Sequence, residues 1–184
     1  VIIRNFDSKI LLIDLPEANL ISAYYLKENF PEKKLYLFDD YQINEFLSFD
    51  DYNKNDIIIL PPNCNIDEEI KFDLFVNSRS MMEMNLEVIS DYFNFIQKYI
   101  LANGYFLNIN RYEKRTVGIP IRISEYPYDQ DWQVIRSQPS LGQIHCRFLL
   151  TKRTNIFVEK NIHQHLQDIH NLLKSNPSLR GLGP

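Results

Sequence analysis

The chain has 184 residues, of which 45% are hydrophobic and 13% aromatic, so it can bury a substantial core and is not expected to be disordered. Its formal net charge of −4 argues against a general nucleic-acid-binding protein, because no basic patch is present to neutralise phosphates. The two cysteines lie far apart and predict neither a disulfide framework nor a zinc site, so we expect a reduced, cytoplasmic protein. No apolar run approaches the roughly 18 residues that a transmembrane helix needs.

Glycine is absent from the first 103 residues. A nucleotide site built on a glycine-rich turn therefore has no such turn in this sequence. The sequence begins at Val1 without an initiator methionine, and we interpret residues 1–5 as the end of a helix that is already under way. We therefore expect one domain over residues 1–175 that lacks its N-terminal segment, followed by a flexible tail over residues 176–184.

Apolar strands alternate with helices along the first two thirds of the chain. Pro16 is typical of a first helical turn, Pro31 ends that helix, and Gly104 is expected to end a longer one. The expected elements are, in chain order, a strand at 9–14, a helix at 17–30, a strand at 34–40, a helix at 41–49, strands at 56–62 and 73–78, a helix at 86–101 and a strand at 105–112.

The pattern changes after residue 112. Two strands, at 132–137 and 146–153, follow each other without a long helix between them, and a helix is expected at 161–174. The alternation of strands and helices predicts an α/β, doubly wound fold with a mostly parallel sheet and helices on both faces. The last two strands predict an antiparallel C-terminal end to that sheet.

Polar side chains follow several of the predicted strands. Asp14 follows the first strand, Pro61 and Asn63 end the third, and Asn77 and Ser78 end the fourth. In open α/β sheets, ligands bind beyond the carboxyl ends of the strands. An acid there can accept both hydroxyls of a ribose, and a neighbouring loop can border an adenine. We therefore expect Asp14, Asn63 and Asn77 to lie along one edge of the sheet, where a nucleoside would bind.

Four segments together resemble one enzyme family. They are IDLPEANLISAYYLKENFP, LFVNSRSMMEM, GYFLNINRY and YPYDQDWQVIRSQPSLGQIH, and their order in the chain is more specific than any one of them. Over about residues 9–150 the chain is similar to the sugar O-methyltransferases, a branch of the class I S-adenosylmethionine-dependent enzymes. The resemblance implies a Rossmann-like fold, S-adenosylmethionine as cofactor, and methylation of a hydroxyl of a sugar or glycan.

The resemblance also implies roles for particular residues. The family's D-L-P segment holds the cofactor ribose, and its N-x-x-S-x-x-E-M segment lines the active site. The expected cofactor-binding residues are Asp14, Leu15, Pro61, Asn63, Asn77 and Ser78, and the active-site segment corresponds to Asn77, Ser80, Glu83 and Met84. The family's glycine-rich turn would precede Val1 and has no counterpart in this sequence.

Methyl transfer to a hydroxyl requires a base that removes the hydroxyl proton. The candidates are Glu83, Asp129, Asp131 and His145, of which we favour His145, for its near-neutral intrinsic pKa, and Glu83, for its place in the active-site segment. His145 can instead be a hydrogen-bonded structural histidine at the start of a strand. Glu83 can instead stabilise the first turn of the following helix.

The segment around Trp132 is a candidate for binding the substrate. Tyr128 and Trp132 can form a stacking wall for a sugar ring, with Asp129 and Ser80 beside it, or they can simply pack a hairpin. We predict no metal site, because His163 and His165 are two residues apart in the final helix and point to different faces.

Two other functions remain open. One is a methyltransferase-like module that binds a nucleotide or a partner without turnover, which the missing glycine-rich turn favours. The other is a different Rossmann-like enzyme acting on nucleotide sugars, but such an enzyme needs a glycine fingerprint and a Tyr-x-x-x-Lys pair near its site.

Overall fold

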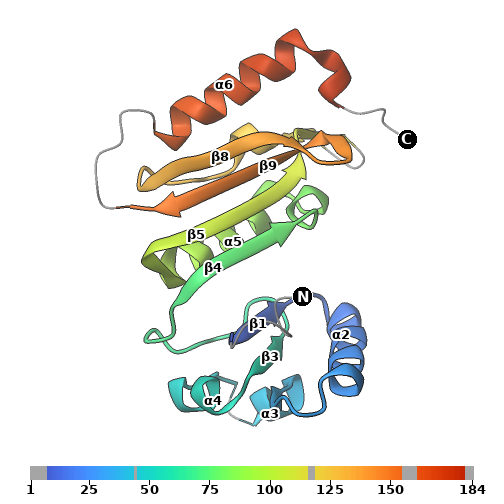
Figure 1. Cartoon of the computed structure of the whole chain (residues 1–184), viewed down its shortest axis with the longest axis vertical. Coiled ribbons are helices and arrows are strands. Elements are labelled where there is room, and N and C mark those ends of the chain that lie inside the picture. The colour runs from blue at the N-terminus through green and yellow to red at the C-terminus, as the bar shows by residue number, and fades with distance from the viewer. Residues whose placement is uncertain (1–7, 44, 116–118, 155–160, 181–184) are drawn as a thin grey trace. The chain divides into compact units, whose positions relative to one another are not determined.

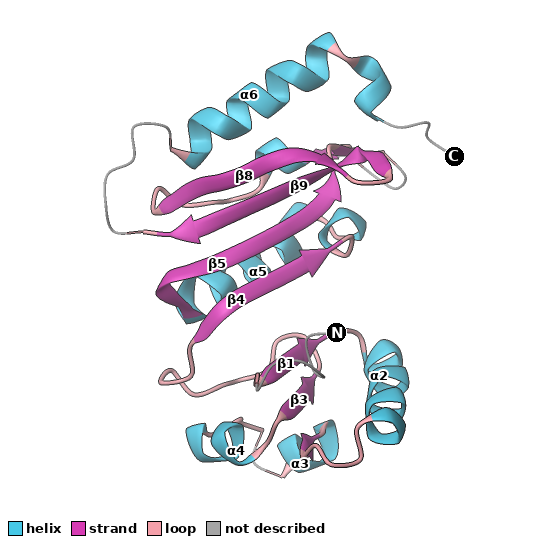
Figure 2. Cartoon of the chain, in the orientation of Figure 1, coloured by secondary structure: helices cyan, strands magenta, loops and turns pink. Residues whose placement is uncertain are grey.

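The computed structural model describes residues 8–43, 45–115, 119–154 and 161–180. The chain divides into two compact units, Val1–Ile70 and Lys71–Pro184, each of which is described by itself. The helix end expected at residues 1–5 lies outside the described residues. Figure 1 labels the elements along the chain, and Figure 2 colours them by type.

The first unit contains three parallel strands in the order β1-β3-β2. The central strand β3 (Ile57–Leu60) is completely buried and pairs with β1 (Ile10–Ile13) on one side and with β2 (Leu35–Tyr36) on the other. Helix α2 (Pro16–Asn29) connects β1 to β2, and its Leu26 packs with Ile57 and Ile59 of β3. A fully apolar strand is expected where both faces of a parallel sheet are covered.

The segment after β2 differs from the expected strand at 34–40 and helix at 41–49. The strand has only two residues because helix α3 (Phe38–Gln42) begins directly after it, and the Asp40 carboxylate accepts the Leu37 N–H at 2.9 Å. Helix α4 (Phe49–Lys54) begins later, where the Ser48 hydroxyl accepts the Asp51 N–H at 3.1 Å. The hydrogen bonds that Asp40 and Ser48 make at the two helix starts therefore decide the structure here, although the apolar residues of 34–40 favour a strand.

The second unit is built on a four-stranded sheet in the order β4-β5-β9-β8 (Figure 1). Strands β4 (Phe72–Ser78) and β5 (Ile100–Arg111) are parallel and are connected through the short helix η1 (Met81–Glu83) and helix α5 (Leu86–Tyr99). Strands β9 (Gln143–Arg153) and β8 (Trp132–Ser140) continue the sheet in antiparallel fashion, which confirms the predicted antiparallel C-terminal end.

Smaller elements complete this unit. The short strands β6 (Glu113–Lys114) and β7 (Ile121–Arg122) pair with each other, and η2 (Ile123–Glu125) follows β7. Helix α6 (Ile162–Ser175) comes after β9, and η3 (Pro177–Arg180) falls within the expected tail.

Helices α5 and α6 contribute to one hydrophobic core. Phe106 and Leu149 of the sheet are both completely buried in that core. The helical side chains in it are Ile89, Phe93 and Ile96 from α5 and Ile162, Leu166, Ile169 and Leu173 from α6. The apolar stripe predicted for the final helix is therefore confirmed. That helices cover both faces of the sheet stays a prediction.

Gly104 does not end the long helix. Helix α5 ends at Tyr99, and Gly104 lies within β5. A Cβ atom at Gly104 would lie 2.7 Å from Ile100 Cγ1 and 3.1 Å from the backbone oxygen of Asp73. The residue is a glycine because β5 approaches β4 closely here, where the strand register shifts between Phe72 and Leu74.

Across the described part of the chain, no helix has the length and apolar character needed to cross a membrane.

Candidate functional site

The carboxyl ends of β1 and β3 lie next to each other in the first unit. Ile13, the last residue of β1, pairs with Leu60, the last residue of β3. Asp14 and Pro61 are the next residues of their strands, so they leave the sheet at the same edge. Asn77, which was predicted to share this edge, lies near the end of β4 in the separate four-stranded sheet, so its place beside Asp14 stays a prediction. Asp14 is exposed, and so is Asn63, whose backbone is left-handed with φ of 62°. This edge therefore presents a carboxylate and an amide to solvent.

Asn19 connects the two strand ends and was not predicted. From the first turns of α2, its amide nitrogen donates to the backbone oxygens of Asp14, at 2.8 Å, and of Leu60, at 2.9 Å. Asp14 Oδ1 also accepts the Leu15 N–H at 2.8 Å. These bonds fix the loop in which Asp14 lies. A carboxylate has about four lone-pair positions, so Asp14 keeps acceptor capacity for a ligand.

Asn77 is part of a hydrogen-bonded amide network in the second unit. Its Oδ1 accepts from Asn110 Nδ2 at 2.9 Å and from the Met81 N–H at 3.2 Å, and its Nδ2 donates to Ser80 Oγ at 2.6 Å. Asn110 also donates to Asn108 Oδ1 at 2.5 Å, and Asn108 donates to the hydroxyl of Tyr128 at 3.2 Å. The polar residues that interrupt the apolar segment at the end of β4 therefore hold the turn that follows.

The other residues of the predicted active-site segment lie on or beside that turn. Ser78, Ser80 and Glu83 are exposed, and Met84 is half-buried. Glu83 is the last residue of η1 and lies three residues before the first residue of α5. The N-cap of α5 is Asn85, whose Oδ1 accepts the Val88 N–H at 2.9 Å. The roles predicted for Asn77, Ser78, Ser80 and Glu83 in binding or catalysis stay predictions.

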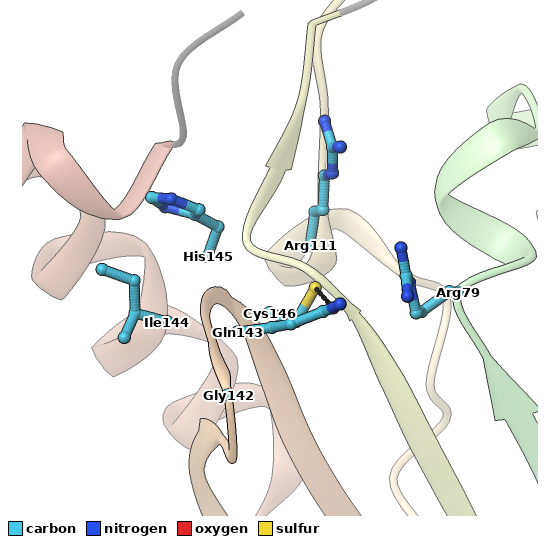
Figure 3. A pocket seen from close by; sticks show the side chains of 7 residues that line it. All are labelled: Arg79, Arg111, Gly142, Gln143, Ile144, His145 and Cys146. Carbon is cyan, nitrogen blue, oxygen red and sulfur yellow. Dashed lines mark hydrogen bonds between the residues drawn. The ribbon is translucent and has the colours of Figure 1, made fainter.

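His145 lines a cavity of about 380 Å³ in the second unit (Figure 3). The other lining residues are Arg79, Arg111, Gly142, Gln143, Ile144 and Cys146. Arg79 directly follows β4 and Arg111 is the last residue of β5, so this cavity lies at the carboxyl ends of two parallel strands. Such a place is where open α/β sheets bind ligands.

Arg79 has an unusual backbone conformation. Its φ is 67°, in the left-handed region that costs a residue other than glycine about 1–3 kcal/mol. The Arg79 N–H donates to the backbone oxygen of Ile109 at 2.7 Å, which holds the strained residue beside β5. This strain is fixed by the surrounding structure, and such strain clusters at functional sites.

The two arginines act on the thiol of Cys146. Burial has the larger effect and raises the pKa of Cys146, whereas the positive charges of Arg79 and Arg111 act in the opposite direction. Both arginines therefore place positive charge near the part of the cavity that Cys146 lines. For Cys64, in the first unit, burial is the largest effect and raises its pKa to about 11.

Tyr128 and Trp132 belong to the core, which corresponds to the packing alternative and not to the stacking wall. Trp132 is completely buried, and Tyr128 is 3% exposed and stacks edge-on against Phe93 at 4.7 Å between ring centroids. Burial raises the pKa of Tyr128. A ring without exposed surface has no face to offer a sugar, so we do not carry a substrate-binding role forward for these two residues.

Asp129 and Asp131 are held by the structure around Trp132. Arg153 forms ion pairs with both, with 3.5 Å between its Nη2 and Asp131 Oδ2. The Asp129 N–H donates to Gln97 Oε1 at 2.9 Å, and Gln97 also accepts from the indole of Trp132. Both carboxylates are already paired with Arg153, so His145 and Glu83 stay the favoured candidates for the base.

Sequence reasoning missed Arg79 and Arg111 as site residues. Both lie at strand ends, but the residues predicted as ligands there were amides and acids, which suit a nucleoside. The signal that could have found them is a cation at the end of each of two consecutive parallel strands. Among the described residues, no group of three or more histidine, cysteine, aspartate or glutamate side chains is placed to hold a metal ion.

Comparison with known proteins gives weak likenesses. No family model matches the chain, and no curated protein matches it. The chain is similar to the structure of TehB from Haemophilus influenzae, with 12% identity over 79% of this chain and 50% of TehB and a TM-score of 0.48. It is also similar to the pyocyanin biosynthetic protein PhzM, with 11% identity over 82% of this chain and 52% of PhzM and a TM-score of 0.38.

The chain spans about half the length of both solved structures. At such identities, and with TM-scores below 0.5, these likenesses establish no family, activity or ligand.

Proposed function

We propose that this protein is an S-adenosylmethionine-dependent O-methyltransferase that methylates a hydroxyl of a sugar or glycan. The proposal rests on the sequence resemblance over residues 9–150 and, in the structure, on one observation. That observation is the exposed carboxylate of Asp14 at the carboxyl end of β1, directly beside the end of the parallel strand β3. An acid at this point of a parallel sheet is suited to the two hydroxyls of a ribose.

The residues around Asp14 support a nucleoside site in the first unit. Helix α2 begins two residues later, with Pro16 in its first turn, so its N-terminus lies next to the carboxylate. Leu15 is exposed beside Asp14 and offers an apolar surface, and Pro61 and Asn63 follow the neighbouring strand. In this proposal Asp14 accepts the ribose hydroxyls, and Leu15, Pro61 and Asn63 border the base. The cofactor, when bound, supplies an electrophilic methyl group on a sulfonium.

In methyl transfer, the main task of the protein is to position the two reacting groups. Because the methyl group is already electrophilic, the protein has to hold a hydroxyl in line with it and accept the hydroxyl proton. His145 lines a cavity large enough for a small ligand and is the first choice for the base. Glu83, exposed at the end of η1, is the second.

Titration of S-adenosylhomocysteine into the protein tests the cofactor side of the proposal. We expect saturable binding that Asp14→Asn weakens at least about tenfold, because the amide replaces one ribose acceptor by a donor. Asp50→Asn is the matched control, since Asp50 is an exposed acid of α4 paired only with Lys54 among the described residues. Binding that is equal in both variants, or no binding to the unaltered protein, would remove the cofactor assignment.

The same preparation separates the enzyme from the alternative of a methyltransferase-like binding module. With S-adenosylmethionine labelled at its methyl group, an enzyme transfers label to one or more sugars of a panel. A module that binds S-adenosylhomocysteine but transfers no label to any sugar is the outcome that favours the alternative, which the absence of glycine from the first 103 residues suggested.

A further inference from the structure

The cavity beside His145 combines two features that a neutral sugar does not require. Among the described residues, its lining includes two arginines and a histidine but no aspartate or glutamate. Neither Arg79 nor Arg111 forms an ion pair with a carboxylate of the described residues. By contrast, three other arginines of this unit, Arg115, Arg122 and Arg153, are each paired with an acid.

We propose that this cavity binds a phosphate group of the substrate, with Arg79 and Arg111 as its ligands. The proposal rests on the proposed function in one respect, namely that the phosphate belongs to the sugar that is methylated. Arginine is suited to this role because its planar guanidinium donates two parallel hydrogen bonds to phosphate oxygens. Two arginines match the two negative charges of a phosphate monoester, whereas a carboxylate carries only one.

The backbone determines where these two side chains leave the sheet. The left-handed conformation of Arg79 is held by the hydrogen bond of its N–H to Ile109, two residues before Arg111. Arg111 pairs with Cys146 across β5 and β9. In the view of Figure 3, Arg111 lies between Arg79 and His145. The two guanidinium groups are therefore carried by backbone positions that are held in place, one at a strand end and one in a strained conformation.

His145 is a third polar residue of the lining, and in Figure 3 its ring points away from Arg79 and Arg111. Its Nδ1 is buried and has no hydrogen-bond partner among the described residues. A buried nitrogen without a partner is uncommon in folded proteins and calls for an explanation, such as a ligand that completes it. The cavity of about 380 Å³ is within the range of small-molecule sites, so it has room for more than an isolated anion.

The net charge of the chain indicates that anion binding is confined to particular sites. The chain carries a formal net charge of −4, so it does not attract anions in general. Close to the Cys146 thiol, by contrast, Arg79 and Arg111 contribute positive charge, which acts to lower the pKa of this thiol against the larger effect of burial. The two positive charges are therefore local to this cavity, in a chain whose net charge is negative.

Calorimetric titration with glucose 6-phosphate, glucose, glucuronate and inorganic phosphate, without any methyl donor, tests the proposal. We expect glucose 6-phosphate to bind, glucose not to bind, and Arg79→Gln and Arg111→Gln each to weaken binding at least about tenfold. Arg111→Lys, which keeps the charge but loses the bidentate geometry, should restore part of the affinity. Arg136→Gln is the control, because Arg136 is an exposed arginine of β8 bonded to Gln138.

Three results would overturn the proposal: no binding of either phosphate, equal binding by all arginine variants, or tighter binding of glucuronate than of glucose 6-phosphate. The fluorescence of Trp132, the only tryptophan, shows whether each variant is folded. If phosphate binds and S-adenosylhomocysteine does not, the proposed function fails while the anion site stands. If only S-adenosylhomocysteine binds, the anion site fails while the proposed function stands.

Discussion

At the scale of single residues, the side chains that interrupt apolar strands have two kinds of partner. Asn77 is bonded within the protein, to Asn110, Ser80 and the backbone of Met81, so part of the polar signal at the end of β4 reflects the folding of a turn. Asp14 and Arg79 instead have exposed side chains, and only the Leu15 N–H is bonded to the carboxylate of Asp14 among the described residues. The sequence marks both kinds of residue alike, because a polar side chain after an apolar strand looks the same whether its partner is a neighbour or a ligand.

Asn110 provides a test of the amide network. It is completely buried, accepts the Met82 N–H at 3.0 Å and donates to Asn77 and Asn108. We expect Asn110→Ala to lower the free energy of unfolding by about 1–3 kcal/mol, because buried partners lose their hydrogen bonds. Urea denaturation measures the change. Asn171→Ala, on the exposed side of α6, should change it by less than about 0.5 kcal/mol, and a similar value for the two variants would contradict the network's role.

At the scale of elements, periodicity located the strands and helices better than it located their ends. The stripe of Ile162, Leu166, Ile169 and Leu173 predicts α6 because a helix that packs on one side repeats its apolar residues every three or four positions. Periodicity predicted too long a strand at 34–40, and the preference of glycine for helix ends predicted a helix stop at Gly104. In both places the ends are set by local hydrogen bonds and by a neighbouring strand, which periodicity does not describe.

Gly104 can be tested against Gly142. We expect Gly104→Ala to lower the free energy of unfolding by about 1–3 kcal/mol, because the new Cβ meets Ile100 and the backbone of β4. Gly142 has a φ of 73° but open space around its Cα, so Gly142→Asn should cost less than about 1 kcal/mol, since asparagine tolerates this conformation. Denaturant unfolding followed by circular dichroism compares the two. Equal costs would mean that close approach is not what requires a glycine at position 104.

At the scale of the whole molecule, the chain consists of two compact units with separate cores. The core of the first unit joins α2 to β3, and the larger core of the second joins α5 and α6 to the sheet around Phe93 and Trp132. Trp132 is the only tryptophan and is completely buried, so its fluorescence reports on the second unit.

Phe93→Ala should weaken the second unit strongly. Phe93 is completely buried and contacts the rings of Phe106, Tyr126 and Tyr128. We expect a loss of about 3–5 kcal/mol, because the truncation leaves a cavity in an aromatic cluster. The unfolding transition of Trp132 fluorescence measures it. Leu141→Ala, at a side chain that is 92% exposed, serves as the control, and an unchanged transition in Phe93→Ala would show that this cluster does not limit stability.

The sequence by itself determined the alternation of strands and helices, the antiparallel C-terminal end and the polar strand ends, because each follows from residue types at short spacing. Only the tertiary structure decided that Asp14 and Pro61 leave neighbouring strands at one edge, that Trp132 is interior, and that Arg79 and Arg111 share a cavity with His145. These facts depend on strand order and on which residues distant in the chain meet. Spacing along a sequence does not fix such contacts, because they arise from the packing of whole elements.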